Sequence, residues 1–322
     1  MKFQGNETML TTIIVNYNTK NLLDSCVAVL RTSAAGIKHQ IIIVDNASQD
    51  GSVEHLRHRF SDCELLFNES NVGFGRANNQ ALALARGRYV LLLNTDAFVA
   101  ADTIHKTVNY LEANPTTGVL GVRLVGRDNV LQPSCRYFPT PWNEFVSRAG
   151  LSRWFPLTRL VDDMAWDHSS IRECDWVPGC YYLVRQSVID QVGLFDPRFF
   201  LYYEEVDHCC AVKAAGWKVV FYPDTTVVHI GGESAKSVSE ITASGRQIDS
   251  LQIESGLLYH RKHHGRIGLA CDVFLITLGD VVLTMKWLIK RRTTTGAKAY
   301  GTHIKTAWRL LSSTGWGHRP TR

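Results

Sequence analysis

The strongest constraint on the fold is an apolar run of strand length that ends abruptly in polar residues. Residues 89–93 carry no charge, and Asn94, Thr95 and Asp96 follow them directly. Such a run is typical of a strand that is buried on both faces, as in a parallel sheet covered by helices. A carboxylate at its carboxyl end lies where open α/β sheets bind their ligands. The alternative is that Asp96 caps a following helix.

The chain before this run repeats the same pattern. Each apolar segment is followed by turn or cap residues and then by a segment with helical periodicity. Strands are expected at residues 10–17, 40–45 and 64–67, and helices to about residue 31, at 52–60 and at 76–86, with Asn18 and Thr19 supplying the first helix cap. Strands that alternate with helices predict an α/β fold whose central sheet is mostly parallel and becomes mixed later in the chain.

Polar clusters follow three of these strands, and the carboxyl ends of parallel strands meet at one edge of a sheet. The clusters are Tyr17 with Asn18, Asp45 with Asn46, and residues 94–96. Beside them, the glycines of residues 73–75 let backbone amides approach a phosphate, and Arg76 can add a bidentate contact. The chain has neither the third glycine of a dinucleotide fingerprint nor a G-K-[ST] phosphate loop. A nucleotide-diphosphate site held partly by a metal ion fits the set better.

The second half of the chain places a group of acids at the start of a helix. Residues 181–184 predict a strand, and Glu204, Glu205 and Asp207 open a helix that ends near residue 215. Acids in the first turn complement the helix dipole, which explains them structurally. They also follow an apolar segment, and a carboxylate beside a dry wall can act as a base with a raised pKa. The residues alone allow both roles.

Two other features also allow a structural and a functional interpretation. His229 follows a strand-like run at residues 225–228, where a lone histidine is either a hydrogen-bonded surface group or a metal ligand. Residues 129–175 have an irregular pattern, with several prolines, many aromatic side chains and Arg136. They form either a mobile cover over a sugar site or a locally packed segment.

In order along the chain, these residues resemble the successive motifs of inverting family 2 glycosyltransferases, particularly their bacterial rhamnosyltransferase-like branch. The motifs of the first half are IIVNYN at 13–18, VDNASQDG at 44–51, NVGFGRANN at 71–79 and LLNTD at 92–96. Those of the second half are W-x-x-G at 176–179, GLFD-x-x-FF at 193–200, YEEVD at 203–207, AGW at 215–217, YP at 222–223 and H-x-GGES at 229–234. The resemblance covers roughly two thirds of the chain.

The resemblance implies a GT-A fold, a nucleotide-diphospho-sugar donor, a divalent metal ion (Mn²⁺ or Mg²⁺) and a set of donor-binding residues. Asp45 would read the pyrimidine base, which Tyr17 would line, and Arg76 would approach the diphosphate. The family's D-x-D motif corresponds to Asn94, Thr95 and Asp96, which would bind the nucleotide-sugar, with Asp96 and His229 as metal ligands. Because one carboxylate of the motif is missing, the diphosphate and waters must supply more of the metal's coordination shell.

The resemblance also implies the catalytic and acceptor residues. The family's E-D-x-D motif appears here as residues 204–207, so Glu205 would be the catalytic base, with Glu204 as the next candidate. Trp176, Gly179 and Asp207 would contact the acceptor or the transferred sugar.

Composition bears on the location of the protein. The chain has 322 residues, 45% of them hydrophobic, which is enough for a large core. Its eight cysteines show no C-x-x-C pair and no zinc-ligand spacing, and residues 1–12 contain no long apolar segment of a signal peptide. We therefore expect reduced thiols and a cytoplasmic location.

The net charge of +5 hides a basic tail. Residues 281–322 contain nine Lys and Arg and no Asp or Glu, which leaves 26 basic against 30 acidic residues elsewhere. Residues 267–289 are apolar, but Asp272, Asp280, Lys286 and Lys290 fall on one part of a helical wheel, and each charge would cost about 2.5–3.5 kcal/mol inside a bilayer. This disfavours a spanning helix and favours an interfacial one over 267–292, with residues 290–292 facing anionic lipids.

Alternatives for the tail helix are packing on the protein's own core or on a second subunit. Nucleic acid is disfavoured as a partner, because no binding module accompanies the basic tail. We expect a nucleotide-sugar-binding half at residues 1–125, an acceptor-binding and catalytic half at 126–250 and a basic, helical C-terminal extension at 251–322.

The expected function is inverting transfer of a sugar to a lipid-linked or cell-surface glycan at the cytoplasmic face of the inner membrane. Rhamnose from dTDP-rhamnose is the favoured donor, and UDP-sugars are the alternative. A catalytically silent sugar-nucleotide-binding or scaffold protein is the rival interpretation. A processive synthase is disfavoured because the chain lacks a Q-x-x-R-W motif.

Overall fold

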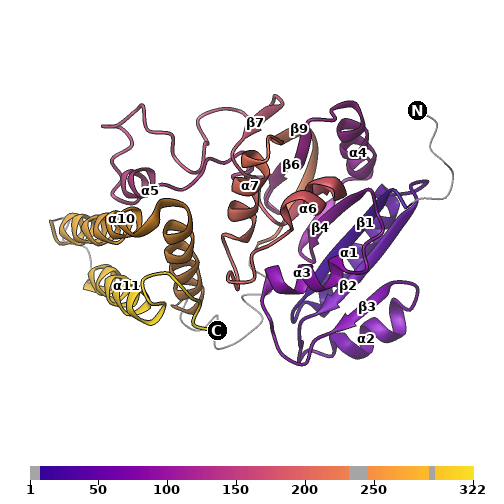
Figure 1. Cartoon of the computed structure of the whole chain (residues 1–322), viewed down its shortest axis with the longest axis horizontal. Coiled ribbons are helices and arrows are strands. Elements are labelled where there is room, and N and C mark those ends of the chain that lie inside the picture. Colours follow the sequence, from indigo (N-terminus) through magenta and orange to yellow (C-terminus); the bar gives the residue numbers. More distant parts are fainter. Residues whose placement is uncertain (1–7, 232–245, 290–293) are drawn as a thin grey trace. The chain divides into compact units, whose positions relative to one another are not determined.

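The computed structural model describes residues 8–231, 246–289 and 294–322 (Figure 1). They form two compact units. Unit 1 comprises Met1–Arg136, Met164–Pro197 and Glu204–Ala243, and unit 2 comprises Tyr137–Asp163, Arg198–Tyr203 and Ser244–Arg322. Residues 232–234 of the H-x-GGES motif and the basic residues 290–292 lie outside the described residues.

Unit 1 is a sheet flanked by helices. Its strands are β1 (Leu10–Asn16), β2 (His39–Asp45), β3 (Glu64–Phe67), β4 (Tyr89–Asn94), β5 (Ala97–Val99), β6 (Thr117–Val125), β7 (Arg172–Cys174), β8 (Tyr181–Arg185) and β9 (Lys218–His229). Its helices are α1 (Lys20–Ser33), α2 (Ser52–Arg59), α3 (Phe74–Leu82), α4 (Thr103–Ala113), α6 (Gln186–Val192) and α7 (Glu204–Ala214).

The strand order confirms a sheet that begins parallel and becomes mixed. The order is β3-β2-β1-β4-β8-β6-β9-β5, and β7 pairs with β9. Strands β1 to β4 pair in parallel, whereas β8 runs antiparallel to both β4 and β6. The antiparallel β8 brings the second half of the chain into the middle of the sheet built by the first half.

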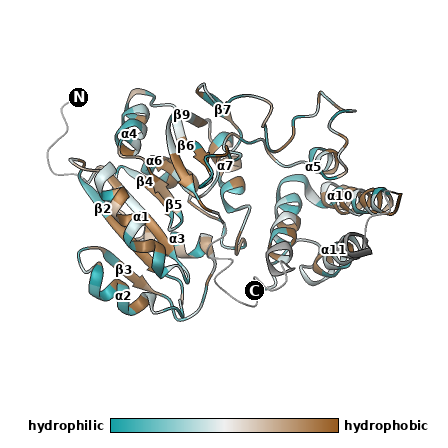
Figure 2. Cartoon of the chain, turned by 180° about the vertical axis from the view of Figure 1, so that it is seen from behind, coloured by the Kyte–Doolittle hydropathy of each residue, from teal (hydrophilic) through white to brown (hydrophobic). Residues whose placement is uncertain are grey.

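The central strands are buried on both faces, as their apolar runs predict. In β4, Tyr89, Leu91 and Leu93 belong to one hydrophobic cluster with α1 and α4, and Val90 and Leu92 point to the opposite face with no exposed surface. In Figure 2, hydrophobic residues, in brown, lie along the central strands and along α1. Alternating side chains that are all buried are typical of a strand covered by helices on both sides.

The predicted cap of the first helix is wrong in one respect. Thr19 stands at the N-cap of α1, but its side chain makes no cap hydrogen bond. Its hydroxyl instead donates to Asn16 Oδ1 at 2.7 Å and lies 2.8 Å from the Thr95 hydroxyl. Asn18 adopts a left-handed backbone, φ 54°. These residues join the ends of β1 and β4 rather than completing a helix end.

Unit 2 is helical, with α5 (Pro141–Arg148), α10 (Arg246–Ile289) and α11 (Thr294–Ser313). Helix α5 starts with a capping box, in which Thr140 and Asn143 each bond the other's backbone amide. Residues 129–175 therefore contain a helix and strand β7, which their irregular pattern did not predict. By length and composition, Ser250–Ile289 could cross a membrane, a test that core helices of soluble proteins also pass.

Helix α10 is broken by a single glycine. The basic residues 261–264 are helical, and the break falls at Gly265, whose φ of 69° and ψ of −164° are not helical. Such a conformation is strained for residues with a Cβ and open to glycine. The second part of α10 then packs Leu269 and Val273 against Leu310 and Leu311 of α11.

Candidate active site

The polar clusters meet at one edge of the sheet, as predicted. Asn16 pairs with Asp45 across β1 and β2, and Val15 pairs with Asn94 across β1 and β4. Tyr17, the residues after Asp45 and the Asn94–Asp96 turn therefore follow three adjacent strand ends. This edge is where open α/β sheets place their ligands.

Asp45 is fully buried and holds the loop after its own strand. Its carboxylate accepts from Asn16 Nδ2 at 2.8 Å and from the Ser48 backbone N–H at 2.9 Å. Ser48 Oγ in turn accepts from the Asn18 backbone N–H at 2.9 Å. Asp45 thus shapes the loops on both sides of β1 and β2, in addition to the base-reading role that the resemblance implies.

Asp96 does not cap a helix. It lies in the turn between β4 and the short strand β5, and the next helix, α4, begins only at Thr103. Strand β5 pairs with β9 so that Ala97 faces His229, and the Ile230 N–H donates to the Asp96 carbonyl at 3.0 Å. This pairing sets Asp96 Oδ1 3.6 Å from His229 Nε2, although 133 positions separate the two residues.

Gln132 fixes the orientation of His229 and was not predicted. Its Nε2 donates to the His229 backbone carbonyl at 2.8 Å, which leaves its Oε1 facing His229 Nδ1 at 3.0 Å. Because Oε1 can only accept, Nδ1 carries the proton and the lone pair of Nε2 points toward Asp96. A ligand histidine is commonly held by such a hydrogen bond on its other nitrogen.

The donor atoms fit a divalent metal ion. Burial lowers the pKa of His229, while the charge of Asp96 opposes this shift, so the neutral imidazole is favoured. A neutral lone pair 3.6 Å from a buried carboxylate repels it unless a cation lies between them. Asp96 and His229 would hold such an ion, and the Asn94 side chain lies at the same turn, where a second carboxylate of the D-x-D motif would stand.

Glu204 and Glu205 begin helix α7 in surroundings that disfavour charge. Burial raises the pKa of both carboxyls, and the charge of Glu205 raises that of Glu204 further. The Gly179 backbone N–H and the Arg136 guanidinium offset part of the effect on Glu205. In the described part of the chain, Oε2 of each glutamate has no hydrogen-bond partner. Glu205 is partly exposed and Glu204 is buried, so Glu205 is the more accessible carboxylate.

Trp176 and Gly179 lie beside Glu205, in the segment that leads into β8. The Trp176 ring is 5% exposed and carries the Arg136 guanidinium 4.0 Å from its centroid. A Cβ added at Gly179 would lie 3.7 Å from Glu205 Oε1, which is ordinary van der Waals contact. Trp176 therefore positions Arg136, and Gly179 offers its N–H to the base.

Helix α3 is tied to the loop after α6. Arg76 Nε donates to the Pro197 carbonyl at 2.8 Å, and the Asn79 amide both donates to and accepts from the backbone of Phe195. The Arg76 side chain thus holds this loop through its hydrogen bond to Pro197.

The remaining predicted site residues differ in how far they are buried. Tyr17 and Asn94 are partly exposed at the sheet edge, Thr95 is 2% exposed and bonds Thr19, and Asp207 is 5% exposed in the first turn of α7. The structure brings Asp96 and His229 together and places Glu204 and Glu205 in the same unit as that pair.

Comparison with known proteins agrees with this arrangement. The family described as Glycosyl transferase family 2 matches residues 11–166. Among curated proteins, the chain is 28% identical over 206 residues to the N-acetylglucosaminyl-diphospho-decaprenol L-rhamnosyltransferase of Mycobacterium tuberculosis, covering 59% of this chain and 66% of that protein. It is 26% identical over 176 residues to the rhamnosyltransferase WbbL of Escherichia coli K12, covering 51% and 63%. The chain thus spans less than two thirds of each relative.

Solved structures agree on the fold. The mannosyltransferase PcManGT from Pyrobaculum calidifontis, in complex with GDP-Man and Mn²⁺, aligns with a TM-score of 0.57 at 16% identity, over 98% of this chain and 88% of that one. Staphylococcus aureus TarS 1–349 aligns with a TM-score of 0.50 at 12% identity, over 96% and 92%. The mixed sheet flanked by helices is a GT-A fold. Residues 11–166 are similar to glycosyl transferase family 2, and both of these curated relatives are rhamnosyltransferases.

Proposed function

We propose that the protein is an inverting glycosyltransferase that uses a nucleotide-diphospho-sugar and a divalent metal ion. The observation that carries the proposal is the Asp96–His229 pair, whose neutral imidazole and carboxylate face one another at 3.6 Å. The pair stands at the sheet edge where the strand ends converge. Buried glutamates in the same unit supply a base of raised pKa.

Each residue then has a task in a single displacement. Glu205 accepts the proton of the acceptor hydroxyl as that oxygen attacks the anomeric carbon. Asp96 and His229 hold a divalent cation, which would neutralise charge on the leaving diphosphate. Tyr17 and Asp45 bind the nucleotide, and Arg76 approaches the diphosphate. Asp207, Trp176 and Gly179 line the acceptor side.

We favour dTDP-rhamnose as the donor and a lipid-linked glycan as the acceptor. The support is that two of the relatives are rhamnosyltransferases and one is named for a diphospho-decaprenol substrate. A UDP-sugar donor is the alternative within the same fold. A catalytically silent sugar-nucleotide-binding protein is the rival from another class, since Asn94 and Glu205 depart from the family's usual carboxylates.

The test is a panel of nucleotide-sugars read by thermal shift, with and without Mn²⁺ or Mg²⁺, followed by an assay of transfer. A donor that binds the folded state raises the melting temperature by mass action. We expect the largest rise with dTDP-rhamnose plus metal, and loss of the metal's contribution in Asp96→Ala. Asp102→Ala, an exposed acid paired with Lys106, is the control. A response unchanged in Asp96→Ala contradicts the metal assignment, and binding without transfer supports the silent rival.

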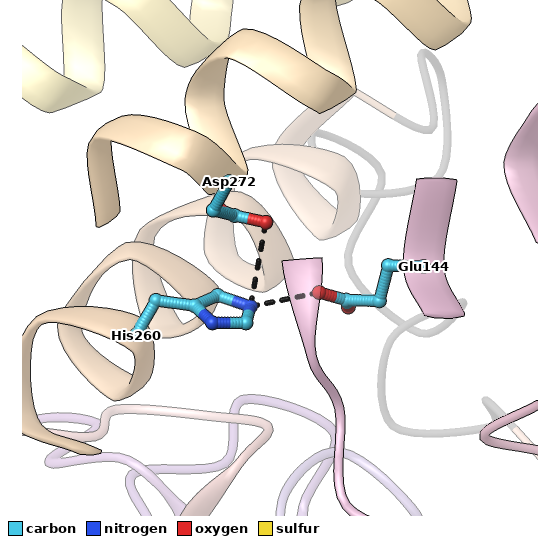
Figure 3. Close-up of side chains that lie close together, drawn as sticks. All are labelled: Glu144, His260 and Asp272. Atoms are coloured by element: carbon cyan, nitrogen blue, oxygen red, sulfur yellow. Dashed lines mark hydrogen bonds and ion pairs between the residues drawn. The ribbon is translucent and has the colours of Figure 1, made fainter. Parts of the chain in front are cut away.

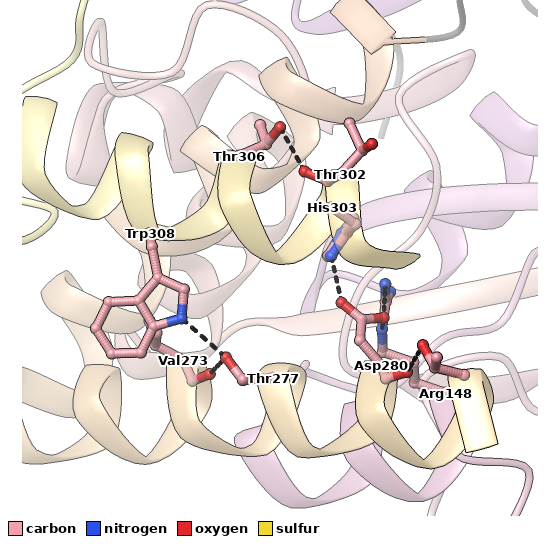
Figure 4. A network of polar contacts seen from close by, with 9 residues as sticks. Arg148, Val273, Thr277, Asp280, Thr302, His303, Thr306 and Trp308 are labelled. Carbon is pink, nitrogen blue, oxygen red and sulfur yellow. Dashed lines mark hydrogen bonds and ion pairs between the residues drawn. The ribbon is translucent and has the colours of Figure 1, made fainter. Parts of the chain in front are cut away.

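We also propose that unit 2 carries the protein to the membrane surface. Two charged residues in the second part of α10, Asp280 and Lys286, are paired within unit 2. Asp280 is fully buried and accepts from Arg148 at 2.7 Å and from His303 at 2.8 Å (Figure 4), and Lys286 donates to the Ala149 carbonyl at 2.6 Å. Binding of the opposite face to lipid would therefore leave these charges paired.

The opposite face is an apolar stripe. It consists of Phe274, Leu278, Val281, Met285 and Leu288, each between 37% and 63% exposed. Their spacing of four and three residues keeps them on one side of a helix. An exposed apolar patch of this kind is typical of an interaction surface. Anionic lipid suits it, because the basic residues of the tail follow directly in the sequence.

Cosedimentation with vesicles tests this second proposal. The wild-type protein is expected to bind vesicles that contain anionic lipid, and the double variant Phe274→Ser, Leu278→Ser to bind them much less. Val130→Ser, an exposed apolar residue of unit 1, is the control. Equal binding of both proteins contradicts the proposal. Loss of a dimer in the double variant, without vesicle binding by the wild type, would assign the stripe to a second copy of the chain.

A further inference from the structure

Three side chains with metal-ligand chemistry meet inside unit 2. Glu144 comes from α5, and His260 and Asp272 come from the two parts of α10 (Figure 3). One ligand atom from each lies within 4.8 Å of the others. His260 and Asp272 are each 1% exposed, and Glu144 is partly buried. No part of the proposed donor site belongs to this cluster.

The break at Gly265 creates the cluster. In an unbroken helix, residues twelve positions apart are separated by about 18 Å along the axis. Here His260 Nε2 lies 3.4 Å from Asp272 Oδ1, because the chain turns back at Gly265. Helix α5 adds Glu144, whose Oε2 lies 2.7 Å from the same His260 nitrogen.

The single proton on His260 Nε2 cannot satisfy both carboxylates of the cluster. A proton on His260 Nε2 serves Glu144 Oε2, and Glu144 Oε1 already accepts from the Tyr203 hydroxyl at 3.0 Å. Asp272 Oδ1 then has no hydrogen-bond partner among the described residues, although it is buried. A buried, unpaired carboxylate is costly, so Asp272 points to a ligand that two carboxylates can share.

The electrostatics of the cluster favour a cation. Burial raises the pKa of Asp272 to about 7, partly opposed by the charge of His260. Burial lowers the pKa of His260, but Asp272 and Glu144 outweigh it and raise that pKa overall. Other titratable groups at the cluster include Tyr203, Tyr259 and His264, and the rings of Tyr259 and His264 each have their centroid 5.3 Å from that of His260. Burial and His260 lower the pKa of His264.

We propose that Glu144, His260 and Asp272 together bind one divalent metal ion of the Zn²⁺ class. One imidazole and two carboxylates form a ligand set that zinc accepts, and a neutral His260 with two carboxylates balances a charge of +2. The Tyr203 hydroxyl orients Glu144 from outside the ligand shell. The ion would hold α5 against both parts of α10. This metal-site proposal does not depend on the proposed function.

The experiment is calorimetric titration of the chelator-treated full-length protein with Zn²⁺, without nucleotide, alongside melting curves. Wild type and Asp96→Ala are both expected to bind Zn²⁺ at this site and to melt at a higher temperature with it. Asp272→Asn and Glu144→Gln should bind more than about tenfold more weakly and lose the rise in melting temperature. Glu254→Gln is the matched control, because Glu254 is a buried acid of unit 2 that bonds Thr321.

The results with these variants either support or overturn the metal site. Retention of a site in Asp96→Ala and its loss in Glu144→Gln, which keeps the size of a partly exposed side chain, support the proposal even if Asp272→Asn fails to fold. Zn²⁺ binding that disappears only in Asp96→Ala overturns it. So does a wild-type protein that binds no Zn²⁺ and melts at the same temperature with and without it, because a proton then holds the cluster.

Discussion

At the scale of single residues, the site depends on which atoms remain free after local hydrogen bonds are made. Gln132 takes the proton-bearing nitrogen of His229, and the Gly179 N–H faces Glu205. These contacts decide which lone pairs are available for a metal ion or a substrate proton. The roles that we propose for Asp96, His229 and Glu205 rest on these contacts.

Glu205→Gln is expected to reduce kcat by about 10²- to 10⁴-fold, the usual contribution of a general base. In the wild type, activity should fall on the acidic side with an apparent pKa above the ordinary 4.5 of a glutamate, because burial raises the pKa of Glu205. The measurement is a pH profile of kcat.

Glu204→Gln is the matched control. Burial and the charge of Glu205 raise the pKa of Glu204 well above its ordinary value, so its neutral form resembles glutamine. We expect a small effect on kcat. A large loss in Glu204→Gln with near-normal activity in Glu205→Gln would exchange the two assignments.

Gln132→Leu is expected to weaken Mn²⁺ binding by about 10- to 100-fold, as loss of a partner behind a ligand histidine commonly does. Activity should recover at saturating metal, because Asp96 and His229 themselves remain. The measurement is activity against Mn²⁺ concentration, with Gln186→Leu as a control on a partly buried amide that bonds Asp190. An unchanged Mn²⁺ dependence would show that Gln132 does not orient His229.

The sequence predicted the residues that follow strands better than the residues that support them. Asp96 and His229 each come directly after an apolar run, so position along one strand marks them. Gln132 lies 97 positions from His229, in a segment without regular periodicity, and only its tertiary position gives it a role. A glutamine amide can bond many kinds of partner, so the presence of a glutamine in the sequence does not indicate a role in the site.

At the scale of secondary structure, the strands of the first half matched their apolar runs to within about two residues, as buried parallel strands should. Strands β5 and β7 are three residues each and form only through pairing with β9, so no local pattern predicted them. The apolar run at Thr117–Val125, which forms β6, is itself typical of a buried strand, but no strand was predicted there. Helix α5 was also missed, although Thr140 and Pro141 are typical of a helix start.

Helix α7 provides a prediction about stability and pH. His208 lies on this buried helix, with Nε2 3.0 Å from the Gly193 carbonyl and Nδ1 2.6 Å from the Tyr182 hydroxyl. Burial lowers its pKa to about 4 from 6.5. Its contribution to stability is therefore complete above pH 6.5 and is lost as the pH falls toward 4, by on the order of 3 kcal/mol.

The measurement is the free energy of unfolding by denaturant between pH 7 and pH 4, for wild type and His208→Gln. The wild type should lose more stability over this range than the variant, which lacks the titrating group. Parallel curves for the two proteins would count against a buried, neutral His208.

At the scale of the whole molecule, the eight cysteines are free thiols in this structure. Cys271 is exposed and lies three residues before Phe274, in register with the apolar stripe. Cys26, Cys135, Cys174, Cys180 and Cys209 are buried. The chain thus carries a natural chemical reporter at the surface proposed to meet the membrane.

Labelling of Cys271 with a maleimide, followed by peptide mass spectrometry, is expected to slow several-fold when vesicles with anionic lipid are added. Labelling of the partly exposed Cys63 in unit 1 should keep its rate. Equal rates at Cys271 with and without vesicles would contradict contact of the stripe with lipid. Slowing that depends on protein concentration alone would indicate a dimer.

The composition of unit 2 has a consequence for how such a protein can change over evolution. The chain enters this unit three times, at Tyr137–Asp163, Arg198–Tyr203 and Ser244–Arg322. No single cut in the gene can therefore remove the unit or transfer it to another enzyme, and a deletion of the last segment would strip Phe145 and Val146 of Leu275 and Val282. The residues of unit 2 that we propose to contact the membrane must therefore be inherited together with those that make the sheet, so any change at that surface has to arise by substitution in place.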